Sequence, residues 1–434
     1  MKLTSLSKEE FKKFADKHEQ ITFHQTNEWA NLKSNTGWKH YFVGLKEKDT
    51  IVAAALLLAK EIPIIKKRMF YSPRGFLIDY NNQEVLKTFT NEIRKFIKKE
   101  NGIFIKIDPY VEYQERDNDG SIVNNGHNNK NTVENLKKLG YKFFGFNTMQ
   151  DTLQPRWMHV IEINGQSEEE IQKCMESKTR QILRKNQKSG IKTREIKRQE
   201  LPLFKSIMEH TGDRRDFIDR PLSYYESMWD SLEPSGMLKI LVAEIDFNEY
   251  EENTKKELNE VETALKDRTY KHDNKILNMN EKKYITANKI DKESIDRLKK
   301  QIEKIHNYKS EYGEKKVLGT ILFLIYGNEV LSLFGGTDDN LLQFQSAYTV
   351  HYAGIKYAID NGYKRYNFYG ITGNFSKENP LYGLYLFKKS FGGHVVELIG
   401  EYDLIISEFW YKTYIIAFKL YHTLKKIKNK ISSS

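Results

Sequence analysis

The sequence predicts an α/β protein built from two similar lobes with mixed sheets, with a helical arm inserted into the second lobe. Three observations lead to this fold class. The chain has 434 residues, more than a single hydrophobic core usually supports. Strand-like and helix-like stretches follow one another in the same order in each half. A long polar segment interrupts the second half where the first half has a short turn.

The first half begins its regular pattern with a β-hairpin. Tyr41–Ala59 contains two apolar runs separated by the charged stretch Glu47–Asp49, which is the pattern of two strands and a turn. A further strand is predicted at Ile103–Ile107, and a helix-like stretch then ends at Leu139-Gly140-Tyr141. This half is therefore expected to form one lobe with strands and helices interleaved.

The second half repeats that order with one change. Ile240–Ile245 and Val317–Ile325 have the composition of two hairpin strands, but about seventy residues separate them. Another strand is predicted at Val330–Phe334, and a helix-like stretch ends at Asn361-Gly362-Tyr363. The two halves are thus predicted to be variants of one structural unit.

The separating segment, Asn248–Gly313, is dominated by Glu, Lys, Asn and Asp. Apolar residues recur in it at spacings of three and four: Leu258, Val261 and Leu265, then Ile295, Leu298, Ile302 and Ile305. This spacing is typical of a coiled-coil seam, and a segment that leaves and re-enters at one hairpin should fold as an antiparallel arm. The arm is either a spacer or dimer-forming element, or an RNA-contacting arm like that of seryl-tRNA synthetase.

A basic helix is expected between the lobes. Ser167 and Glu170 form a capping box, which marks a helix start. Basic residues crowd the stretch after it: Lys178, Arg180, Arg184, Lys185 and Lys188. Arg180 and Arg184 share one helix face and suit two successive RNA phosphates, whereas the alternative is an ordinary solvated face.

The last segment, Phe409–Tyr421 and the lysines after it, is predicted to be a basic amphipathic helix. Its lysines interrupt the apolar run, so it cannot span a bilayer, although it can rest on an anionic membrane surface. A helix docked on the protein is the alternative. The expected limits are 1–150 for the first lobe, 151–247 and 314–405 for the second, 248–313 for the arm and 406–434 for the C-terminal helix.

Composition narrows the function classes. A net charge of +11 favours a polyanionic partner, either nucleic acid, a phosphorylated substrate or anionic lipid. The single cysteine, Cys174, excludes an internal disulfide framework, and the histidines lack ligand-like spacing, so neither a metal nor a cofactor is expected. No GxSxG, Walker A, GxGxxG or HExxH motif occurs, which leaves direct transfer between two bound substrates. Without a signal-like or membrane-spanning run, a cytoplasmic location is expected.

Nine short motifs occur in a fixed order along the chain. They are HQTNEWANLK (His24–Lys33), SPRGFLIDY (Ser72–Tyr80), IKIDPY (Ile105–Tyr110), QPRW (Gln154–Trp157), IDRP (Ile218–Pro221), LFGGT (Leu333–Thr337), YNFYGITG (Tyr366–Gly373), YLFKKSFG (Tyr385–Gly392) and IGEYD (Ile399–Asp403). Together with the arm, this succession resembles the FemABX peptidyltransferases, especially the branch of FemA, FemB and the lysostaphin-immunity proteins. The resemblance covers nearly the whole chain. It implies two GNAT-like subdomains, an aminoacyl-tRNA donor, and lipid II or its nucleotide precursor as acceptor.

Aminolysis of an aminoacyl ester suits a chain without an evident nucleophile. The protein must align the amine with the ester carbonyl, take up the proton of the amine and stabilise the oxyanion. A lysine-type amine, with a pKa of roughly 10.4, is mostly protonated at neutral pH. By the resemblance, Lys388 in YLFKKSFG lies beside the donor ester and stabilises the tetrahedral intermediate. Asp108 in IKIDPY either orients the incoming amine or caps the following turn.

The resemblance also implies residues that bind the acceptor. Lys33 and Arg220 align with residues that hold the diphosphate of the precursor, and Tyr224 aligns with a tyrosine of the same pocket. A guanidinium fork and a compact ammonium both suit phosphate oxygens. Arg74 in SPRGFLIDY and Tyr369 in YNFYGITG are taken as further substrate-binding residues.

One position departs from the family pattern: Phe334 stands where some relatives carry a tyrosine. We expect Phe334 to be a packing residue and Tyr369 to complete the pocket. The expected function is extension of the interpeptide bridge with glycine, or with serine as the alternative, and TGWKH (Thr36–His40) resembles members that add the first bridge residue. Peripheral contact with the inner membrane surface and assembly with itself or related transferases are also expected. An acetyl-CoA-dependent N-acyltransferase and a non-catalytic RNA-binding scaffold remain open alternatives.

Overall fold

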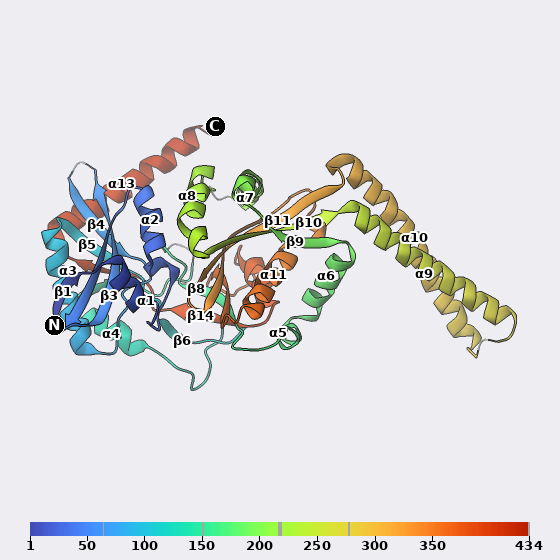
Figure 1. Ribbon diagram of the computed structural model, residues 1–434, viewed down its shortest axis with the longest axis horizontal. Helices are drawn as coiled ribbons and strands as arrows, with labels where there is room; N and C mark the ends of the chain where they lie inside the picture. Colours follow the sequence, from blue (N-terminus) through green and yellow to red (C-terminus); the bar gives the residue numbers. More distant parts are fainter. Residues whose placement is uncertain (64, 150–151, 216–218, 277, 433–434) are drawn as a thin grey trace.

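Two mixed sheets form the body of the protein (Figure 1). This computed structural model describes residues 1–434 except 64, 150–151, 216–218, 277 and 433–434, and describes no side chains at 215 and 421–432. The first sheet runs, in strand order, β1 (Lys2–Ser5), β2 (Lys39–Glu47), β3 (Thr50–Ile62), β4 (Lys67–Ser72), β5 (Gly102–Ile107), β15 (Tyr402–Ile405) and β7 (Tyr141–Phe143). The second runs β6 (Glu112–Glu115), β14 (His394–Leu398), β8 (Trp157–Glu162), β13 (Arg365–Ile371), β12 (Glu329–Thr337), β11 (Lys315–Tyr326), β10 (Leu238–Asp246) and β9 (Ile191–Glu195).

Each sheet contains the same four-strand unit. An antiparallel hairpin leads to a third strand, a helix and a fourth strand parallel to the third: β2, β3, β4, α3 and β5 in the first, β10, β11, β12, α11 and β13 in the second. Both expected hairpins are confirmed. The strand of the second unit that corresponds to Ile103–Ile107 is β13, however, and not Val330–Phe334, which corresponds to β4. The shift arises because β4 (KRMFYS) is short, half polar and inconspicuous in the sequence.

Two strands belong to the other sheet than the predicted lobe boundaries imply. Strand β6, from the first 150 residues, pairs with β14 in the second sheet. Strand β15 pairs with β5 and β7 in the first sheet. Each strand covers a sheet edge that would otherwise present unpaired backbone groups. The limits at residues 150 and 405 therefore do not separate the two sheets.

Helices cover both sheets and fill the space between them (Figure 1). In the first lobe they are α1 (Lys8–Ala15), α2 (Asn27–Asn35), α3 (Gln83–Lys99) and α4 (Lys130–Lys138). In the second they are α5 (Glu168–Cys174), α6 (Ser177–Lys188), α7 (Leu201–Arg215), α8 (Leu222–Leu232), α11 (Ser346–Asp360) and α12 (Tyr382–Lys389). One apolar core is shared by both lobes and contains Phe23 and Trp29 from the first and Phe204 and Tyr225 from the second. This shared core holds α2 against α8.

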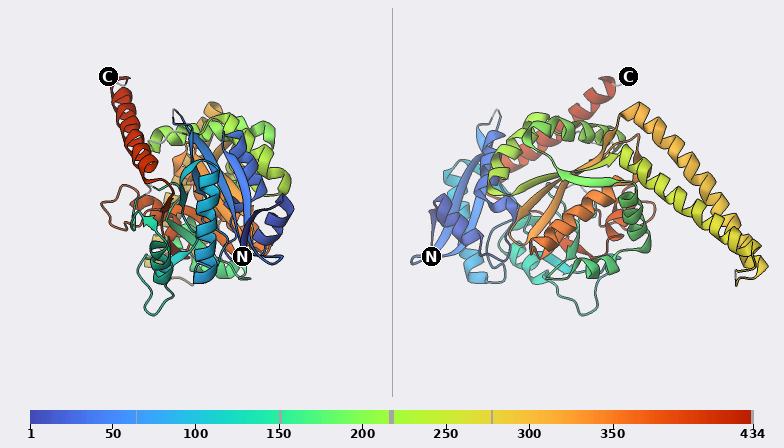
Figure 2. Two further views of the ribbon diagram at one scale, coloured as in Figure 1. Left: turned by 90° about the vertical axis from the view of Figure 1, so that its left-hand side faces the viewer. Right: turned by 45° about the vertical axis from the view of Figure 1, so that its right-hand side comes forward.

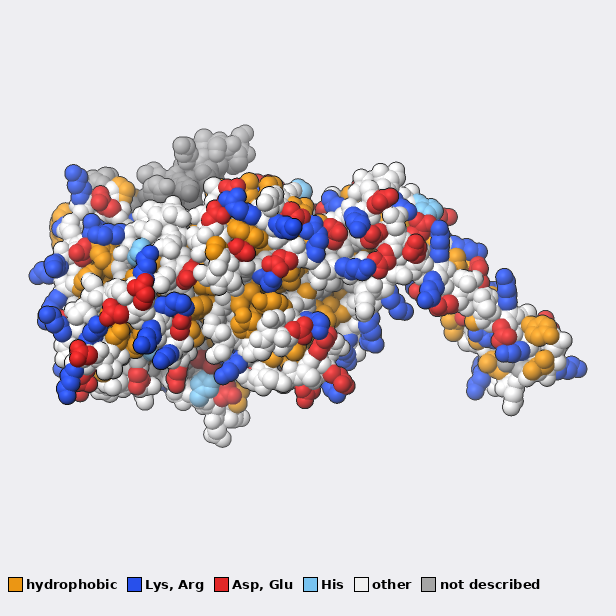
Figure 3. Space-filling view, viewed as in Figure 1, with side chains coloured by type: hydrophobic (Ala, Val, Ile, Leu, Met, Phe, Trp, Pro, Cys, Tyr) orange, Lys and Arg blue, Asp and Glu red, His pale blue; other side chains and the backbone are white. Residues whose placement is uncertain are grey.

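The inserted segment forms the expected antiparallel pair, α9 (Phe247–Asp273) and α10 (Glu281–Tyr312), which projects from the body (Figures 1 and 2). Ile295, Leu298 and Ile305 of the predicted seam are buried. Ion pairs such as Arg268–Asp291 (2.6 Å) join the helices across the seam. Figure 3 shows charged side chains of both signs along the arm and apolar ones at its end, where Tyr270 and Ile285 are exposed.

The C-terminal helix α13 (Glu408–Ser432) docks by its first turns and then leaves the body. Tyr411 packs edge-on against Phe104, with ring centroids 5.2 Å apart, and its hydroxyl donates to Asp403 (2.8 Å). Farther along, Ile416 and Leu420 are exposed. None of the helices in the described part of the chain combines the length and the apolar character that a bilayer crossing needs.

Candidate functional site

Lys388 lies buried where α12 packs against β13. It is 7% exposed, and its Nζ donates hydrogen bonds to the carbonyl oxygens of Phe368 and Gly370, both at 2.7 Å. Within the described residues, no carboxylate lies within ion-pair distance of Lys388. Burial therefore lowers the pKa of Lys388 to about 7, because a buried ammonium without an acidic partner is costly to keep charged.

The surroundings of Lys388 are neutral rather than acidic. His159 and His351 are both buried. Burial, and then the charge of Lys388, lowers the pKa of His159 to about 3 and that of His351 well below its usual value. Both imidazoles are thus uncharged near neutral pH, and the ammonium of Lys388 is the local source of positive charge.

Tyr369 stands between the two carbonyl groups that Lys388 contacts. The pairing of β13 with β8 shifts register between Asn367 and Gly370, and Tyr369 has a φ of +62°, which is rare for a residue other than glycine. Its N–H donates to Asn367 Oδ1 (2.7 Å), and its hydroxyl donates to Gln154 Oε1 (2.5 Å). This β-bulge turns the flanking carbonyls toward Lys388 while the Tyr369 ring lines the cleft that contains Arg74.

Arg74 and Asp108 follow β4 and β5, two parallel neighbours, so their residues meet at the same sheet edge. The N–H of Arg74 donates to Asp108 Oδ1 (2.8 Å), and Arg74 Nη1 lies 3.7 Å from Oδ2. Both residues are 3% exposed. Burial raises the pKa of Asp108 to about 7, although the charge of Arg74 acts in the opposite direction. Among the described residues, Oδ2 of Asp108 has no hydrogen-bond donor.

A narrow cleft between the two sheets contains Arg74 and Tyr369, the neighbours of Asp108 and Lys388. Its lining residues come from both lobes: Thr22, Phe23, His24, Arg74, Tyr110, Met158, Glu329, Leu331 and Tyr369. Glu329 accepts hydrogen bonds from Tyr110 (3.2 Å) and Asn367 (3.0 Å), and burial raises its pKa. The empty space is about 170 Å³ and does not admit a water molecule. A substrate amine can enter only if side chains of the cleft move.

A second group of sequence-predicted residues meets at the contact of α2 with α8. The Nζ of Lys33 lies 4.4 Å from the centre of the Trp29 ring, and the guanidinium of Arg220 lies 5.5 Å from that of Tyr224. Burial, followed by the like charge of Arg220, lowers the pKa of Lys33 to about 8. Neither cation has a carboxylate within ion-pair distance in the described part of the chain. Two facing cations without an acid favour a bound anion.

His24 connects this cationic group with the cleft. It is fully buried, and after burial itself the charges of Arg74 and then Lys33 lower its pKa well below the usual value. His24 therefore lies within electrostatic reach of both. The predicted residues thus fall into two groups, Lys33, Arg220 and Tyr224 in one and Arg74, Asp108, Tyr369 and Lys388 in the other, and His24 lies between a cation of each.

This arrangement can supply what aminolysis of an ester needs. The ammonium of Lys388 can stabilise a developing oxyanion, and a carboxyl group with a pKa near neutrality can accept a proton from an amine. No set of three or more His, Cys, Asp or Glu side chains in the described residues could hold a metal ion.

Comparison with known proteins identifies the relatives of the chain. The model of the FemAB family matches residues 6–419. The chain belongs to the FemAB family. The aminoacyltransferase FemA of Staphylococcus epidermidis is 34% identical over 99% of this chain and 100% of its own length. Aminoacyltransferase FemA of Staphylococcus aureus is 32% identical over the same shares of the two chains.

The fold of this FemAB protein agrees with a solved relative. The crystal structure of FemX superimposes with a TM-score of 0.78 and 26% identity, covering 95% of this chain and 99% of FemX. The expected fold class, two mixed α/β subdomains with an inserted helical arm, is confirmed, as is the enzyme class, an aminoacyltransferase. The resemblance that the nine motifs indicated is likewise confirmed.

The basic helix of this FemAB protein differs from its sequence prediction. The capping box of Ser167 and Glu170 is present, but it opens the short helix α5, and the basic residues lie on a separate helix, α6. Arg180 turns back, and its Nη1 donates to the carbonyl oxygens of Gln172 and Met175 at the end of α5. Arg180 and Arg184 therefore do not present two equivalent guanidinium groups. Lys178 and Lys185 are exposed on α6.

Some residues of the site were not predicted. Glu329 is the first residue of β12 and stands just before the strand predicted at Val330–Phe334. Glu397 lies buried and pairs with Arg116 and Arg156, which places a charged triad behind the cleft. Gln154 and Arg156 belong to the QPRW motif, so that motif was the sequence feature that could have identified them as site residues. Phe334 packs edge-on against Tyr225, with ring centroids 5.7 Å apart, as expected for a packing residue.

Proposed function

We propose that this FemAB aminoacyltransferase moves glycine, or serine as the alternative, from aminoacyl-tRNA to the amine of a lipid II-type peptidoglycan precursor and so extends the interpeptide bridge. The observation that carries the proposal is the position of two buried groups around Tyr369. Lys388, which has no acidic partner among the described residues, holds the carbonyls on either side of Tyr369, and Tyr369 lines one cleft with Arg74, whose N–H donates to the buried carboxyl group of Asp108. The two staphylococcal relatives bear the name of an aminoacyltransferase, which supports the reaction class.

The reaction assigns separate roles to the two groups. The ammonium of the precursor gives one proton to the Asp108 carboxylate, and the resulting neutral amine attacks the ester carbonyl carbon. Lys388 stabilises the negative charge that develops on the carbonyl oxygen. As the tetrahedral intermediate collapses, its nitrogen loses a second proton, the bond to the ribose oxygen breaks, and the ribose oxygen takes up one proton while the other leaves to solvent from Asp108. The hydrogen bond from Lys388 to Phe368 O holds the backbone beside Tyr369, and the N–H of Arg74 holds the Asp108 carboxylate.

The acceptor is proposed to bind with its diphosphate at Lys33 and Arg220, beside Tyr224. The charge of Arg220 lowers the proton affinity of Lys33, and a dianionic ligand bound by both cations would offset this repulsion. His24 then marks the route from the diphosphate toward the cleft. The peptide part of the precursor would follow this route to bring its amine to Asp108.

A cytoplasmic location with peripheral membrane contact fits a lipid-linked acceptor. Helices α2, α8 and the free end of α13 lie on the same, upper side of the molecule in Figure 1 and in both views of Figure 2, which share their vertical axis. Phe409, Ile416 and Leu420 of α13 are exposed, and Lys412 accompanies them. A bilayer on that side would receive the helix and present the precursor diphosphate to Lys33 and Arg220.

The direct test is transfer with purified components. The protein is incubated with glycyl-tRNA or seryl-tRNA and lipid II, unmodified or already carrying one to several glycines, and each acceptor is weighed by mass spectrometry. A gain of one glycine or one serine residue identifies donor and position. No mass gain on any acceptor, or a gain of an acetyl group when acetyl-CoA replaces the tRNA, would refute the proposal.

Membrane contact needs its own measurement. Flotation with vesicles of phosphatidylglycerol should recover the full chain, and Ile416→Glu/Leu420→Glu should remain unbound. The transfer of glycine to a water-soluble acceptor without the lipid tail should be unchanged in that variant. Equal flotation of both proteins would contradict the proposed membrane side.

A further inference from the structure

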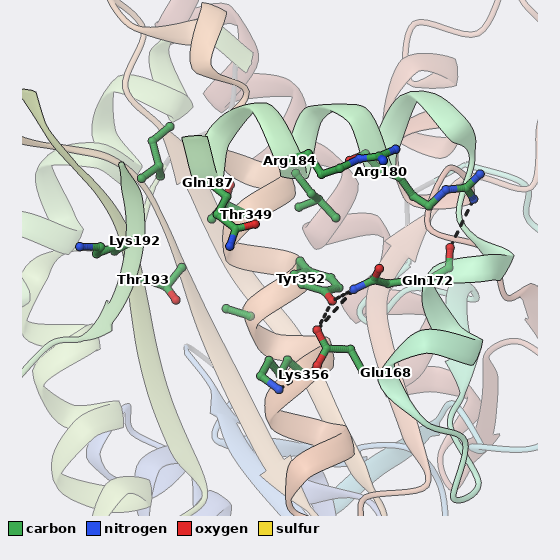
Figure 4. A pocket seen from close by; sticks show the side chains of 13 residues that line it. Glu168, Gln172, Arg180, Arg184, Gln187, Lys192, Thr193, Thr349, Tyr352 and Lys356 are labelled. Atoms are coloured by element: carbon green, nitrogen blue, oxygen red, sulfur yellow. Dashed lines mark hydrogen bonds and ion pairs between the residues drawn. The ribbon is translucent and has the colours of Figure 1, made fainter. Parts of the chain in front are cut away.

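A cavity of about 680 Å³ opens in the second lobe beside the edge strand β9 (Figure 4). Its described lining residues include none of those that line the cleft of Arg74 and Tyr369. Helix α6 forms one wall, α11 another, and α5 and β9 close the two ends. The volume falls within the roughly 300–1,000 Å³ of cavities that take a small organic ligand. The proposed roles of Lys388 and Asp108 leave this cavity unused.

The cavity carries a positive charge. Four cationic side chains and one carboxylate line it: Arg180, Arg184, Lys192, Lys356 and Glu168. Three of the cations are already held. Arg180 donates to the end of α5, Lys192 pairs with Glu249 (2.6 Å), and Lys356 pairs with Glu168 (2.9 Å).

Arg184 differs from these three. Its Nε donates to the carbonyl oxygen of Arg180 (3.2 Å), which fixes the side chain, and in the described part of the chain it has no carboxylate within ion-pair distance. Its terminal nitrogens are free to hold a phosphate through two parallel hydrogen bonds. The site therefore offers one guanidinium that is fixed in place and has no acidic partner among the described residues, whereas Lys192 and Lys356 are ion-paired.

The rest of the lining suits a flat heterocycle rather than a simple inorganic anion. Leu183, Ile191 and Ala353 provide an apolar surface, and Tyr352 is fixed there by its hydroxyl, which donates to Glu168. Polar groups able to donate and accept hydrogen bonds stand among them: Gln187, Thr193 and Thr349. A phosphate, a stacked ring and a polar ring edge together describe a nucleotide of a single-stranded nucleic acid.

The cavity also lies between the arm and the candidate active site. At one end, Lys192 pairs with Glu249, and Asn253 Nδ2 donates to the carbonyl oxygen of Lys188 (3.0 Å), so α6 and β9 contact the first turns of α9. At the other, the N–H of Glu176 donates to the carbonyl oxygen of Ser390 (2.9 Å), two residues after Lys388. An RNA that delivers its 3′ end to Lys388 can pass this cavity.

We propose that this cavity binds one nucleotide of a single-stranded segment of the donor RNA, with its phosphate on Arg184 and its base against Leu183 and Tyr352. The proposal rests on the proposed function in that it takes the donor to be a tRNA. It divides the basic residues of α6 into Arg184, which contacts RNA, and Lys178 and Lys185, which do not.

The test is equilibrium binding of deacylated tRNA and of a short labelled RNA with the same single-stranded 3′ end, measured by fluorescence anisotropy at several salt concentrations. Arg184→Ala should weaken both about tenfold and lower the salt dependence by roughly 0.7, the value of one single-strand phosphate. Lys185→Ala removes the same charge from the same helix and should bind as wild type does. Equal loss in both variants would reduce the effect to general charge and overturn the proposal.

A second variant tests the cavity rather than the charge. Ala353→Trp fills the space without altering any cation, and it should weaken RNA binding while its thermal unfolding temperature stays within a few degrees of wild type. Wild-type affinity in a folded Ala353→Trp protein would overturn the proposal, as would Arg184-dependent binding to phosphatidylglycerol vesicles in place of RNA. Since deacylated RNA is used, binding can succeed even if transfer of an amino acid is never observed, so the two proposals fail separately.

Discussion

Lys388 holds the two peptide carbonyls on either side of Tyr369. Each of the hydrogen bonds from Nζ, to Phe368 O and to Gly370 O, is 2.7 Å long. The same lysine therefore stabilises the bulge that gives Tyr369 its positive φ and supplies the charge nearest to that bulge. A change at Lys388 should alter both the chemistry and the conformation of the site, and the two effects need to be separated.

We predict that Lys388→Met lowers kcat by about 10²–10³-fold, the effect of removing one oxyanion-stabilising group. The KM for the acceptor should change little, because the diphosphate is bound elsewhere. Single-turnover transfer of labelled glycine measures both quantities. Lys389→Met is the matched control, since Lys389 is its neighbour on α12 but pairs with Asp119. A loss of activity as large in the control would show that the helix, and not the Lys388 ammonium, is at issue.

The stability of the protein should report the burial of Lys388 independently of activity. Its pKa is about 7 in the folded protein and 10.5 in an ordinary lysine. Between these values the unfolded chain binds more protons, so this group makes the free energy of unfolding rise with pH. Denaturant unfolding from pH 7 to 10 should therefore give a shallower rise in Lys388→Met than in wild type. Parallel curves would contradict a buried, depressed lysine.

A pH dependence of transfer is expected from Asp108. Burial raises its pKa to about 7, so the carboxylate that accepts the proton is lost as the pH falls through that value. We expect kcat to fall about tenfold per pH unit below 7. Because the Lys388 ammonium also loses its proton near pH 7, kcat should fall again above that pH. Asp108→Asn should lower kcat at pH 7 and remove only the fall on the acidic side. If the acidic fall persists in Asp108→Asn, another group accepts the proton.

The fold could be predicted where a pattern is local. The hairpin at Tyr41–Ala59 and the seam of Leu298 and Ile305 depend on neighbouring residues only. The pairing of Ile240–Ile245 with Val317–Ile325 spans the arm and was predicted because the second half repeats the order of the first. The exchange of β6 and β15 between sheets could not be predicted, because pairing of short strands far apart in sequence leaves no periodic signal. The break between α5 and α6 was missed for another reason: a capping box marks where a helix begins and not where it ends.

The candidate site was predicted through motifs, and the structure adds the reasons for their side-chain types. The two motifs that contain Lys388 and Tyr369 do not show that the residues are connected. The connection is the bulge of β13, which brings the carbonyls next to Tyr369 to Nζ of Lys388. The sequence did not show that Arg180 and Arg184 are held differently, because spacing along a helix does not tell where a long side chain bends. Burial, which sets the pKa values of Lys388 and Asp108, has no counterpart in a sequence motif.

For the acceptor, we predict that Lys33→Met and Arg220→Met each raise KM by about 10–100-fold, as expected for the loss of a charged hydrogen bond of about 1.5–3 kcal/mol. The value of kcat at saturating acceptor should stay within a few-fold of wild type. Inorganic pyrophosphate should compete with the acceptor in wild type and less so in either variant. Lys13→Met, on the exposed face of α1, is the control and should leave KM unchanged. A fall in kcat without a change in KM would contradict diphosphate binding at these residues.

The buried triad of Arg156, Glu397 and Arg116 should be the most sensitive point for stability outside the apolar cores. Glu397 is 3% exposed and takes Arg156 on one carboxylate oxygen and Arg116 on the other. Removing it leaves two guanidinium groups with little solvent, and breaking a buried pair in this way costs about 3–5 kcal/mol.

Glu397→Ala should therefore lower the free energy of unfolding by that amount in urea titration. Glu92→Ala, which removes a carboxylate that pairs with an exposed lysine, should cost less than about 1 kcal/mol. Because the triad joins β8, β14 and the segment after β6, its loss should also loosen the cleft, and hydrogen exchange of the β8 amides should rise in Glu397→Ala. Unchanged exchange together with an unchanged unfolding midpoint would show that the two arginines find other partners.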